Sequence, residues 1–298
     1  MLKAEGLAEL YFLRVSIYCC MLRKLGRNNP IRLIYKNYLR CKGQTKSRSD
    51  SQVVIDILIP VLEKDLVTLP SVVFCARKYI NNPIGNIVIV GRTGLTEKFC
   101  KIHNCIFLDE DLVLPIKKTD ILHNNVVWYR SGWIFQQLIK LSADELVQNE
   151  NVLILDADTC LTTKQSFILD DNKIILNFSD EFHFPYKHYV DILNLKKRFL
   201  LSFICHHMLF NKIILKRIKK EIELNTGKNW IDAILTNIDF NVTSSFSEYE
   251  MYGNYIYYNY PERVHLEYWS NKSLQTNVLN IERIEGYKDK YKSISFHK

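Results

Sequence analysis

The stretch Asn151-Val-Leu-Ile-Leu-Asp156-Ala-Asp158-Thr-Cys160 decides the fold that we expect for this chain. Four apolar residues lead into two aspartates one residue apart, which is typical of a buried strand that ends at an open edge of a sheet. In α/β folds, ligands bind beyond the carboxyl ends of the strands. We therefore expect Asp156 and Asp158 to hold a hard divalent cation against a phosphate-bearing substrate, with water completing the coordination.

The Asp-x-Asp motif is short, and such a pair also occurs by chance. The alternative is a solvated turn with two aspartates after a strand. The apolar run before Asp156 favours the metal site, because it places both carboxylates at the end of a buried strand.

Three further strands are expected before this one, over residues 53–60, 86–91 and 105–109. Residues 66–80 have the apolar spacing of a helix, with Pro70 near its start. Repeated strand–loop–helix units predict an α/β fold with a doubly wound, mixed but mostly parallel sheet flanked by helices. No Gly-x-Gly-x-x-Gly or phosphate-loop motif follows any of these strands, which disfavours a dinucleotide-binding or phosphate-loop enzyme.

Residues 128–141 predict a loop that enters a helix just before the aspartate strand. Gln136 and Lys140 are four residues apart and share one helix face. This helix could direct Arg130, Gln136 and Lys140 towards a diphosphate. The alternative is a solvated amphipathic helix with aromatic packing.

After Asp158, residues 173–178 predict another strand, and residues 179–189 form a loop rich in aromatic and polar groups that would suit a sugar. His206 and His207 follow in a stretch that we expect to be extended. Adjacent side chains of a strand point to opposite faces, so at most one of these histidines would face a site.

Residues 244–255 begin like a capped helix, with Ser245 or Ser247 as the cap and a glutamate following. Glu248 is a candidate general base and Glu250 a candidate structural hydrogen-bonder, or the reverse. The alternative is that both glutamates only stabilise the start of the helix. Residues 255–260 are rich in tyrosine and predict a strand, and the tail beyond Asn271 shows short strand-like pieces without clear chemistry.

Composition and charge limit the partners of the chain. Its 298 residues are 47% hydrophobic and 12% aromatic, enough for a sizeable core in one large or two small domains. Residues 1–50 hold eleven Lys and Arg against three acidic residues, so this arm carries the whole net charge of +8. Such charge favours an anionic partner, but the balanced remainder and the lack of a recognised motif argue against nucleic acid.

The arm itself allows two interpretations. Residues 1–40 have the pattern of a basic amphipathic helix, which could lie on an anionic membrane surface, and residues 42–52 have the composition of a linker. Alternatively, the helix packs on the main domain or forms a mobile arm. Residues 7–22 contain Glu9 and Arg14 and are too short and too charged to span a bilayer. They also lack a small-residue cleavage site, which argues against a signal peptide.

Cysteine usage indicates the compartment. Eight cysteines are scattered without any Cys-x-x-Cys pair, which disfavours a disulfide scaffold and structural zinc. We therefore expect a protein of the reducing cytoplasm, with peripheral attachment to the inner face of the cell membrane if the arm binds lipid.

Four segments in order, residues 55–60, 130–141, 153–158 and 246–255, carry a family resemblance. With them the chain resembles nucleotide-sugar-dependent glycosyltransferases of the GT-A type. More narrowly, it looks like a bacterial family of glycosyltransferase-like proteins, catalogued as a domain of unknown function and linked to surface polysaccharide or lipopolysaccharide synthesis. The resemblance covers roughly residues 53–265.

The resemblance implies a glycosyltransferase domain over residues 51–298, with a donor half near 51–165 and an acceptor half near 166–270. Asp156 and Asp158 would hold Mn²⁺ or Mg²⁺ at the diphosphate of a nucleoside diphosphate sugar, where the ion stabilises the leaving group. A late histidine would complete the metal shell, and the candidates are His265 and His207.

The sugar acceptor would be a glycan or a lipid-linked acceptor. If the reaction inverts the anomeric centre, a carboxylate must deprotonate the acceptor hydroxyl, and Glu248 is the first candidate, followed by Glu250 and Asp180. A retaining reaction needs no such base.

Two other classes compete with the glycosyltransferase. A nucleotidyltransferase also uses paired aspartates, but residues 59–63 lack the glycine-rich loop that it usually needs. A non-catalytic protein that binds a membrane or a partner with the same fold is the second alternative.

Overall fold

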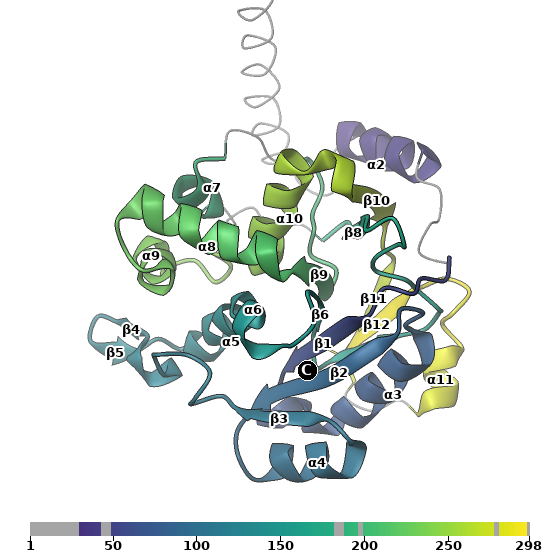
Figure 1. The fold of residues 1–298 in the computed structure, drawn as a ribbon, viewed down its shortest axis with the longest axis horizontal. Coiled ribbons are helices and arrows are strands. Elements are labelled where there is room, and N and C mark those ends of the chain that lie inside the picture. Colours follow the sequence, from purple (N-terminus) through teal and green to yellow (C-terminus); the bar gives the residue numbers. More distant parts are fainter. Residues whose placement is uncertain (1–29, 43–48, 182–187, 196–198, 277–279, 297–298) are drawn as a thin grey trace, which may run out of the picture.

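A five-stranded mixed sheet forms the centre of the computed structural model, which describes residues 30–42, 49–181, 188–195, 199–276 and 280–296 (Figure 1). Its strand order is β3-β2-β1-β6-β9. The strands are β1 (Ile55–Pro60), β2 (Ile84–Gly91), β3 (Ile106–Asp109), β6 (Asn151–Leu155) and β9 (His207–Asn211). The first four run parallel, and β9 pairs antiparallel with β6. The predicted mixed, mostly parallel α/β sheet is therefore confirmed.

Strand β1 lies in the middle of this sheet and is buried along its whole length. Its one charged residue, Asp56, is fully buried, and its carboxylate accepts hydrogen bonds from the backbone N–H groups of Asn86, Gln148 and Asn149 and from the Asn149 side chain, at 2.8–2.9 Å. A buried carboxylate with this many donors is satisfied. Asp56 thus joins β1 to the segments that enter β2 and β6, at the end of the sheet opposite the Asp-x-Asp motif.

Helices cover the sheet on both sides. Figure 1 shows α3 and α4 beside β1 to β3, and α8, α9 and α10 gathered beyond β6 and β9. The longer helices after β1 are α3 (Leu69–Tyr79), α4 (Leu95–His103), α5 (Ser131–Leu141), α8 (Lys212–Thr226), α9 (Trp230–Asn237) and α10 (Glu248–Asn259). Shorter elements are η2 (Glu63–Val67), η3 (Lys118–Asp120), β4 (Leu122–His123), β5 (Val126–Val127), α6 (Ala143–Leu146), α7 (His188–Leu193), η4 (Pro261–Arg263) and α11 (Ile281–Glu285).

Two small sheets support the edge of the central one. Strand β8 (Ile174–Phe178) pairs parallel with β10 (Val264–Tyr268). Strand β12 (Ser293–Phe296) lies between β11 (Asn271–Leu274) and β7 (Thr159–Leu161). Because β7 follows Asp158 directly, the C-terminal tail packs against the motif, and the Phe296 N–H donates to the Asp158 carbonyl over 2.9 Å.

The strand predicted over residues 255–260 is wrong, because helix α10 continues to Asn259. Tyr252, Tyr255 and Ile256 are all buried, and their spacing places them on one helical face. The Tyr255 hydroxyl donates to Glu221 of α8 over 2.6 Å. Packing against α8 thus overrides the β-propensity of the tyrosines.

Helix α2 (Pro30–Lys42) packs on the domain, as one of the two interpretations of the arm expected. Lys36 Nζ lies 2.9 Å from Asp180 Oδ2, and the Arg40 guanidinium lies 4.6 Å from the ring centre of Tyr268 on β10. Residues 1–29 of the expected arm and residues 43–48 of the expected linker are outside the described residues. Within the described ranges, no helix has both the length and the apolar character needed to cross a bilayer.

Candidate functional site

A cavity of about 720 Å³ opens at the carboxyl ends of β1 and β6. It is lined by residues that follow these two strands, by one face of α5 and by the first turn of α10. In a mostly parallel sheet, this edge is where ligands are expected to bind. Six residues of the wall have titratable side chains that contact one another or could bind an ion: Lys140, Asp156, Asp158, Glu181, His206 and Glu248.

Asp156 and Asp158 reach this cavity because β6 ends at Leu155, directly before Asp156. The Asp156 N–H donates to the His206 carbonyl over 3.0 Å, and the Thr159 N–H donates to the Asp156 carbonyl over 3.1 Å, which closes a turn. Ligand atoms of Asp156, Asp158 and His206 all lie within 4.8 Å of one another. Two carboxylates and one imidazole form a donor set that fits Mn²⁺ or Mg²⁺, with water at the remaining positions.

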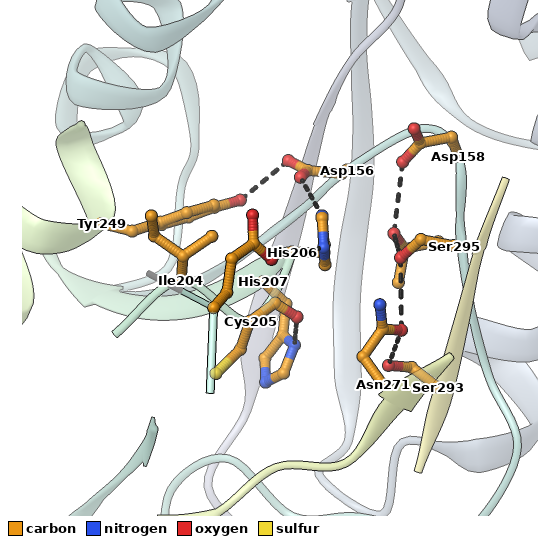
Figure 2. A network of polar contacts seen from close by, with 12 residues as sticks. Asp156, Asp158, Ile204, Cys205, His206, His207, Tyr249, Asn271, Ser293 and Ser295 are labelled. Atoms are coloured by element: carbon orange, nitrogen blue, oxygen red, sulfur yellow. Dashed lines mark hydrogen bonds and ion pairs between the residues drawn. The ribbon is translucent and has the colours of Figure 1, made fainter. Parts of the chain in front are cut away.

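The His206 ring connects two acidic side chains in the cavity wall. Its Nδ1 lies 3.3 Å from Asp156 Oδ2 (Figure 2), and its Nε2 lies 3.2 Å from Glu181 Oε2. Burial lowers the pKa of His206, but the two carboxylates outweigh burial and raise that pKa to about 10. The ring is therefore protonated without a metal, and a bound ion would replace this proton.

The structure brings His206 to the aspartates, whereas the sequence prediction chose His207 or His265. His206 has a left-handed backbone with a φ of 63°, which lets its ring leave the path of the strand that starts at His207. Figure 2 shows the two rings in different places. His207 Nδ1 lies 2.9 Å from the Cys205 carbonyl oxygen, and His207 Nε2 lies 2.9 Å from Asn177 Oδ1. His265 lies on β10, outside the cavity lining.

Lys140 is the central cation of the site. Its ammonium lies 2.7 Å from both Asp156 Oδ1 and Glu248 Oε1, and 3.2 Å from the Tyr249 hydroxyl. Burial lowers the pKa of Lys140, but the two carboxylates outweigh it and raise that pKa above its usual range. Burial alone raises the pKa of Asp156, yet the charge of Lys140, with further help from His206, holds it well below its usual range.

The first turn of α10 supplies the other side of this network. Ser247 caps the helix, as predicted, and its Oγ accepts from the Glu250 N–H over 3.3 Å. The cap directs Glu248 and Tyr249 into the cavity, where the Tyr249 hydroxyl donates to Asp156 Oδ1 over 2.8 Å (Figure 2). Burial raises the pKa of Glu248, although Lys140 opposes the shift.

The other two candidate bases do not line the cavity. Glu250 is buried on the opposite side of α10, where it accepts from the Ser202 hydroxyl over 2.7 Å and from the Asn254 amide over 2.9 Å. The half-exposed Asp180 side chain contacts Lys36 and the Tyr268 hydroxyl. Their contacts are those of structural residues.

Other side chains of α5 and the loop before it also line the cavity, among them Arg130, Gln136 and Gln137. Arg130 and Gln136 were predicted, and the Arg130 guanidinium lies 4.4 Å from the ring centre of Trp133. Gln137 was missed. Its Oε1 accepts from the Glu248 N–H over 3.2 Å, and its buried Nε2 has no hydrogen-bond partner within the described part of the chain.

Asp65 was missed as a site residue, and its only sequence signal was its place just after the first strand. It lines the same cavity. Burial, with a smaller contribution from the charges of Asp158 and Asp156, raises the pKa of Asp65 to about 6, although Lys64 opposes the shift. The cavity thus concentrates negative charge that a bound cation would offset.

The chain matches the model of a known protein family. Residues 93–295 match the model of a family described as "Family of unknown function (DUF6492)". The chain belongs to the DUF6492 family. The matched part contains α5, the Asp-x-Asp turn, His206 and the start of α10, whereas β1 and Asp65 lie before it.

A search of curated proteins finds no match to this DUF6492 chain. Among solved structures it is similar to mouse xyloside xylosyltransferase 1, with 14% identity over 82% of this chain and 97% of that one and a TM-score of 0.45. It is also similar to the galactosyltransferase LgtC, with 10% identity over 82% and 87% and a TM-score of 0.40. The bifunctional glycosyltransferase WbbM matches with 13% identity over 84% and 46% and a TM-score of 0.42. Membership of a family of unknown function agrees with the narrower resemblance, to a family catalogued as a domain of unknown function.

Proposed function

We propose that this DUF6492 protein is a metal-dependent glycosyltransferase that moves a sugar from a nucleoside diphosphate sugar to a carbohydrate acceptor. One observation carries the proposal: Asp156, Asp158 and His206 present ligand atoms within 4.8 Å of one another in a cavity of about 720 Å³ at the carboxyl edge of the sheet. The volume is within the range of small-molecule sites. The sequence resemblance supports sugar transfer as the reaction.

Asp156, Asp158 and His206 would hold Mn²⁺ or Mg²⁺, and the bound ion would stabilise the negative charge of a leaving nucleoside diphosphate. Arg130, at the start of α5, lines the same cavity and offers a fixed cation and several donors to phosphate oxygens. Trp133 and Tyr129 add aromatic surface for a sugar or a base.

The position of Lys140 on its helix suggested a contact with a diphosphate, but we propose that Lys140 orients Asp156. Its ammonium contacts Asp156 and Glu248 in the cavity wall, so it would orient the carboxylate that we propose as a metal ligand. Lys140 and the Tyr249 hydroxyl both donate to Asp156 Oδ1. The other oxygen, Asp156 Oδ2, lies beside His206 and would therefore bind the ion.

Glu248 is our candidate base for an inverting reaction. It lines the cavity and burial raises its pKa, so it is a better proton acceptor than an exposed glutamate. Its backbone N–H is held by Gln137 and its carboxylate by Lys140, which fix its position. A retaining reaction would leave Glu248 as an orienting residue for Lys140.

The test is a thermal-shift screen of the full chain against nucleoside diphosphates and their sugars, with and without Mn²⁺. A ligand that binds only the native state raises the melting temperature. We expect stabilisation by one diphosphate that needs the metal and is lost in Asp158→Asn. Asp171→Asn is the matched control, because this exposed aspartate pairs with Lys173 and lies outside the cavity lining.

Product analysis separates the alternatives. A glycosyltransferase releases a nucleoside diphosphate from the stabilising donor, whereas a nucleotidyltransferase consumes a nucleoside triphosphate and releases pyrophosphate. If neither a diphosphate nor a triphosphate shifts the melting temperature with Mn²⁺ present, the proposal is wrong and a non-catalytic role takes its place.

We also propose that α2 faces an anionic membrane surface that carries a lipid-linked acceptor. Helix α2 belongs to the basic arm. Its Ile34 and Tyr38 side chains are 68% and 55% exposed, whereas its Arg32 side chain is buried. Exposed apolar residues beside basic ones are typical of interfacial helices. Anionic liposomes should float the full chain but not a variant with Ile34→Asp and Tyr38→Asp, and equal flotation of both would contradict the idea.

A further inference from the structure

We propose that Glu181 is a positioning residue of the metal site: it holds the His206 ring by Nε2 so that Nδ1 faces the ion-binding carboxylates. The inference rests on the metal site proposed above and names a residue that the sequence did not single out. Glu181 lines the cavity, and its Oε2 lies 3.2 Å from His206 Nε2.

The two nitrogens of His206 have different neighbours, which decides how the ring is used. Nδ1 lies 3.3 Å from Asp156 Oδ2, inside the group of ligand atoms, and Nε2 lies beside Glu181 on the other side of the ring. Figure 2 shows the His206 ring directed at Asp156. Nδ1 is therefore the nitrogen available to an ion, and Nε2 is the one available to Glu181.

The backbone places Glu181 and His206 in a fixed relation. Ser179 and Ser202 form an antiparallel bridge, in which the Ser179 N–H donates to the Ser202 carbonyl over 2.8 Å. The Ser179 hydroxyl donates to the Ile204 carbonyl, and it also accepts from the Glu181 N–H over 3.1 Å. Glu181 is thus tied to the segment that leads into His206, so the two side chains meet without relying on a flexible loop.

This arrangement has a clear chemical use. A neutral imidazole that binds a metal through one nitrogen carries its proton on the other, and a carboxylate that accepts this N–H fixes both the tautomer and the ring orientation. His206 needs such support because its left-handed backbone removes it from the strand that would otherwise hold it. Glu181 acts through His206 and does not itself belong to the group of ligand atoms.

Asp180 provides a matched control next to Glu181. Its carboxylate contacts Lys36 and the Tyr268 hydroxyl and lies outside the cavity lining. Asp180→Asn therefore removes one negative charge at the adjacent position without touching His206. Glu181→Gln removes the charge but keeps an oxygen that accepts from Nε2, whereas Glu181→Ala removes both.

The experiment is a titration of the full chain with Mn²⁺ at pH 7.5 without nucleotide, in which the spectrum of free Mn²⁺ is followed by electron paramagnetic resonance. We expect Glu181→Ala to weaken Mn²⁺ binding roughly 10- to 100-fold, the usual effect of losing a hydrogen-bond partner behind a ligand. By the same argument, the Mn²⁺ affinity of Glu181→Gln should stay within about 3-fold of that of the unmodified chain. The Mn²⁺ affinity of Asp180→Asn should equal that of the unmodified chain. Melting temperatures without metal verify that every variant folds.

Two outcomes overturn the inference. If Glu181→Ala binds Mn²⁺ like the unmodified chain while Asp158→Asn loses it, the metal site stands and Glu181 does not position His206. If Glu181→Gln loses as much affinity as Glu181→Ala, Glu181 acts by its charge and not as an acceptor. Failure of the unmodified chain to bind Mn²⁺ would remove the proposed metal site and this inference with it.

Discussion

Lys140 Nζ lies 2.7 Å from Asp156 Oδ1, although the two residues belong to different elements and only the fold brings them together. The same nitrogen lies 2.7 Å from Glu248 Oε1. One buried cation is therefore shared by the carboxylate at the end of β6 and the carboxylate at the start of α10. The candidate metal site and the candidate base share this contact, so they are built as one unit.

Loss of Lys140 should destabilise the protein strongly. In Lys140→Met, Glu248 would lose its cation, whereas Asp156 would lose Lys140 but keep His206 and the Tyr249 hydroxyl. Breaking a buried pair costs roughly 3–5 kcal/mol. We expect about 3 kcal/mol in urea unfolding at pH 7, the lower end of that range, because the Asp156 side chain is 23% exposed. The double variant Lys140→Met with Glu248→Gln should recover about 1 kcal/mol of this loss, since one stranded charge is gone. Additive effects of the two substitutions would contradict the shared contact.

The cap of α10 can be tested with two neighbouring serines. Ser247→Ala removes the hydroxyl that accepts from the Glu250 N–H and should cost about 1 kcal/mol of unfolding free energy. Ser245 is fully buried, and its hydroxyl has no hydrogen-bond partner among the described residues. Ser245→Ala should therefore be neutral or slightly stabilising. The opposite order of the two variants in urea unfolding would show that the cap is assigned to the wrong serine.

Two glycines should respond to alanine in opposite directions. At Gly253 an added Cβ would lie 2.6–2.8 Å from Phe203 side-chain atoms, so α10 or Phe203 must shift. We expect Gly253→Ala to cost about 1–3 kcal/mol in chemical unfolding. At Gly132, on α5 in the cavity wall, no atom lies within 4 Å of an added Cβ.

Gly132→Ala should therefore stabilise the ligand-free protein by about 0.5 kcal/mol, because alanine favours helix more than glycine does. The same methyl group enters the cavity and should weaken any nucleotide that the thermal-shift screen identifies. Unchanged ligand affinity in Gly132→Ala would show that the ligand lies elsewhere in the cavity.

His207 should make the protein sensitive to acid. Burial lowers the pKa of His207 to about 3, although the contact with the Cys205 carbonyl opposes this shift, whereas in the unfolded chain the pKa is near the ordinary 6.5. The folded state thus keeps His207 neutral, and its contribution is present above pH 6.5 and is lost as the pH falls towards 3. Between pH 7 and pH 5 the loss amounts to about 2 kcal/mol of unfolding free energy.

His207→Gln removes this titration. Its unfolding free energy, measured in urea at both pH values, should fall by about 2 kcal/mol less than that of the unmodified chain over the same interval. The variant will also be less stable at pH 7, because the His207 ring packs 4.1 Å from the ring centre of Trp269. A decline parallel to that of the unmodified chain would show that His207 does not cause the acid sensitivity.

Elements with a strong local pattern were predictable. Strands β1, β2, β3 and β6 each carry an apolar run that favours a buried strand in any context, and Asp156 and Asp158 follow from the end of β6. Ser247 was one of two predicted caps, because a serine before a glutamate-rich first turn satisfies helix N–H groups locally.

Residues that depend on distant contacts were not predictable. The extended pattern around His206 and His207 concealed the left-handed backbone that turns the His206 ring towards the aspartates. Glu181 becomes a site residue only through the bridge between Ser179 and Ser202. No local signal distinguishes these positions.

The sequence by itself thus determined the parallel strands, the carboxylates at their edge and the face of α5 that carries Lys140, because propensity and periodicity act within a few residues. Only the tertiary structure decided which histidine joins Asp156, which carboxylate supports it and how the tail covers the motif. There, a chain of hydrogen bonds runs from Asp158 through Thr159 and Ser295 to Asn271. Figure 2 shows Asp158, Ser295 and Asn271 along this chain. These choices arise from strand docking and buried polar contacts between residues up to 136 positions apart, which no local pattern encodes.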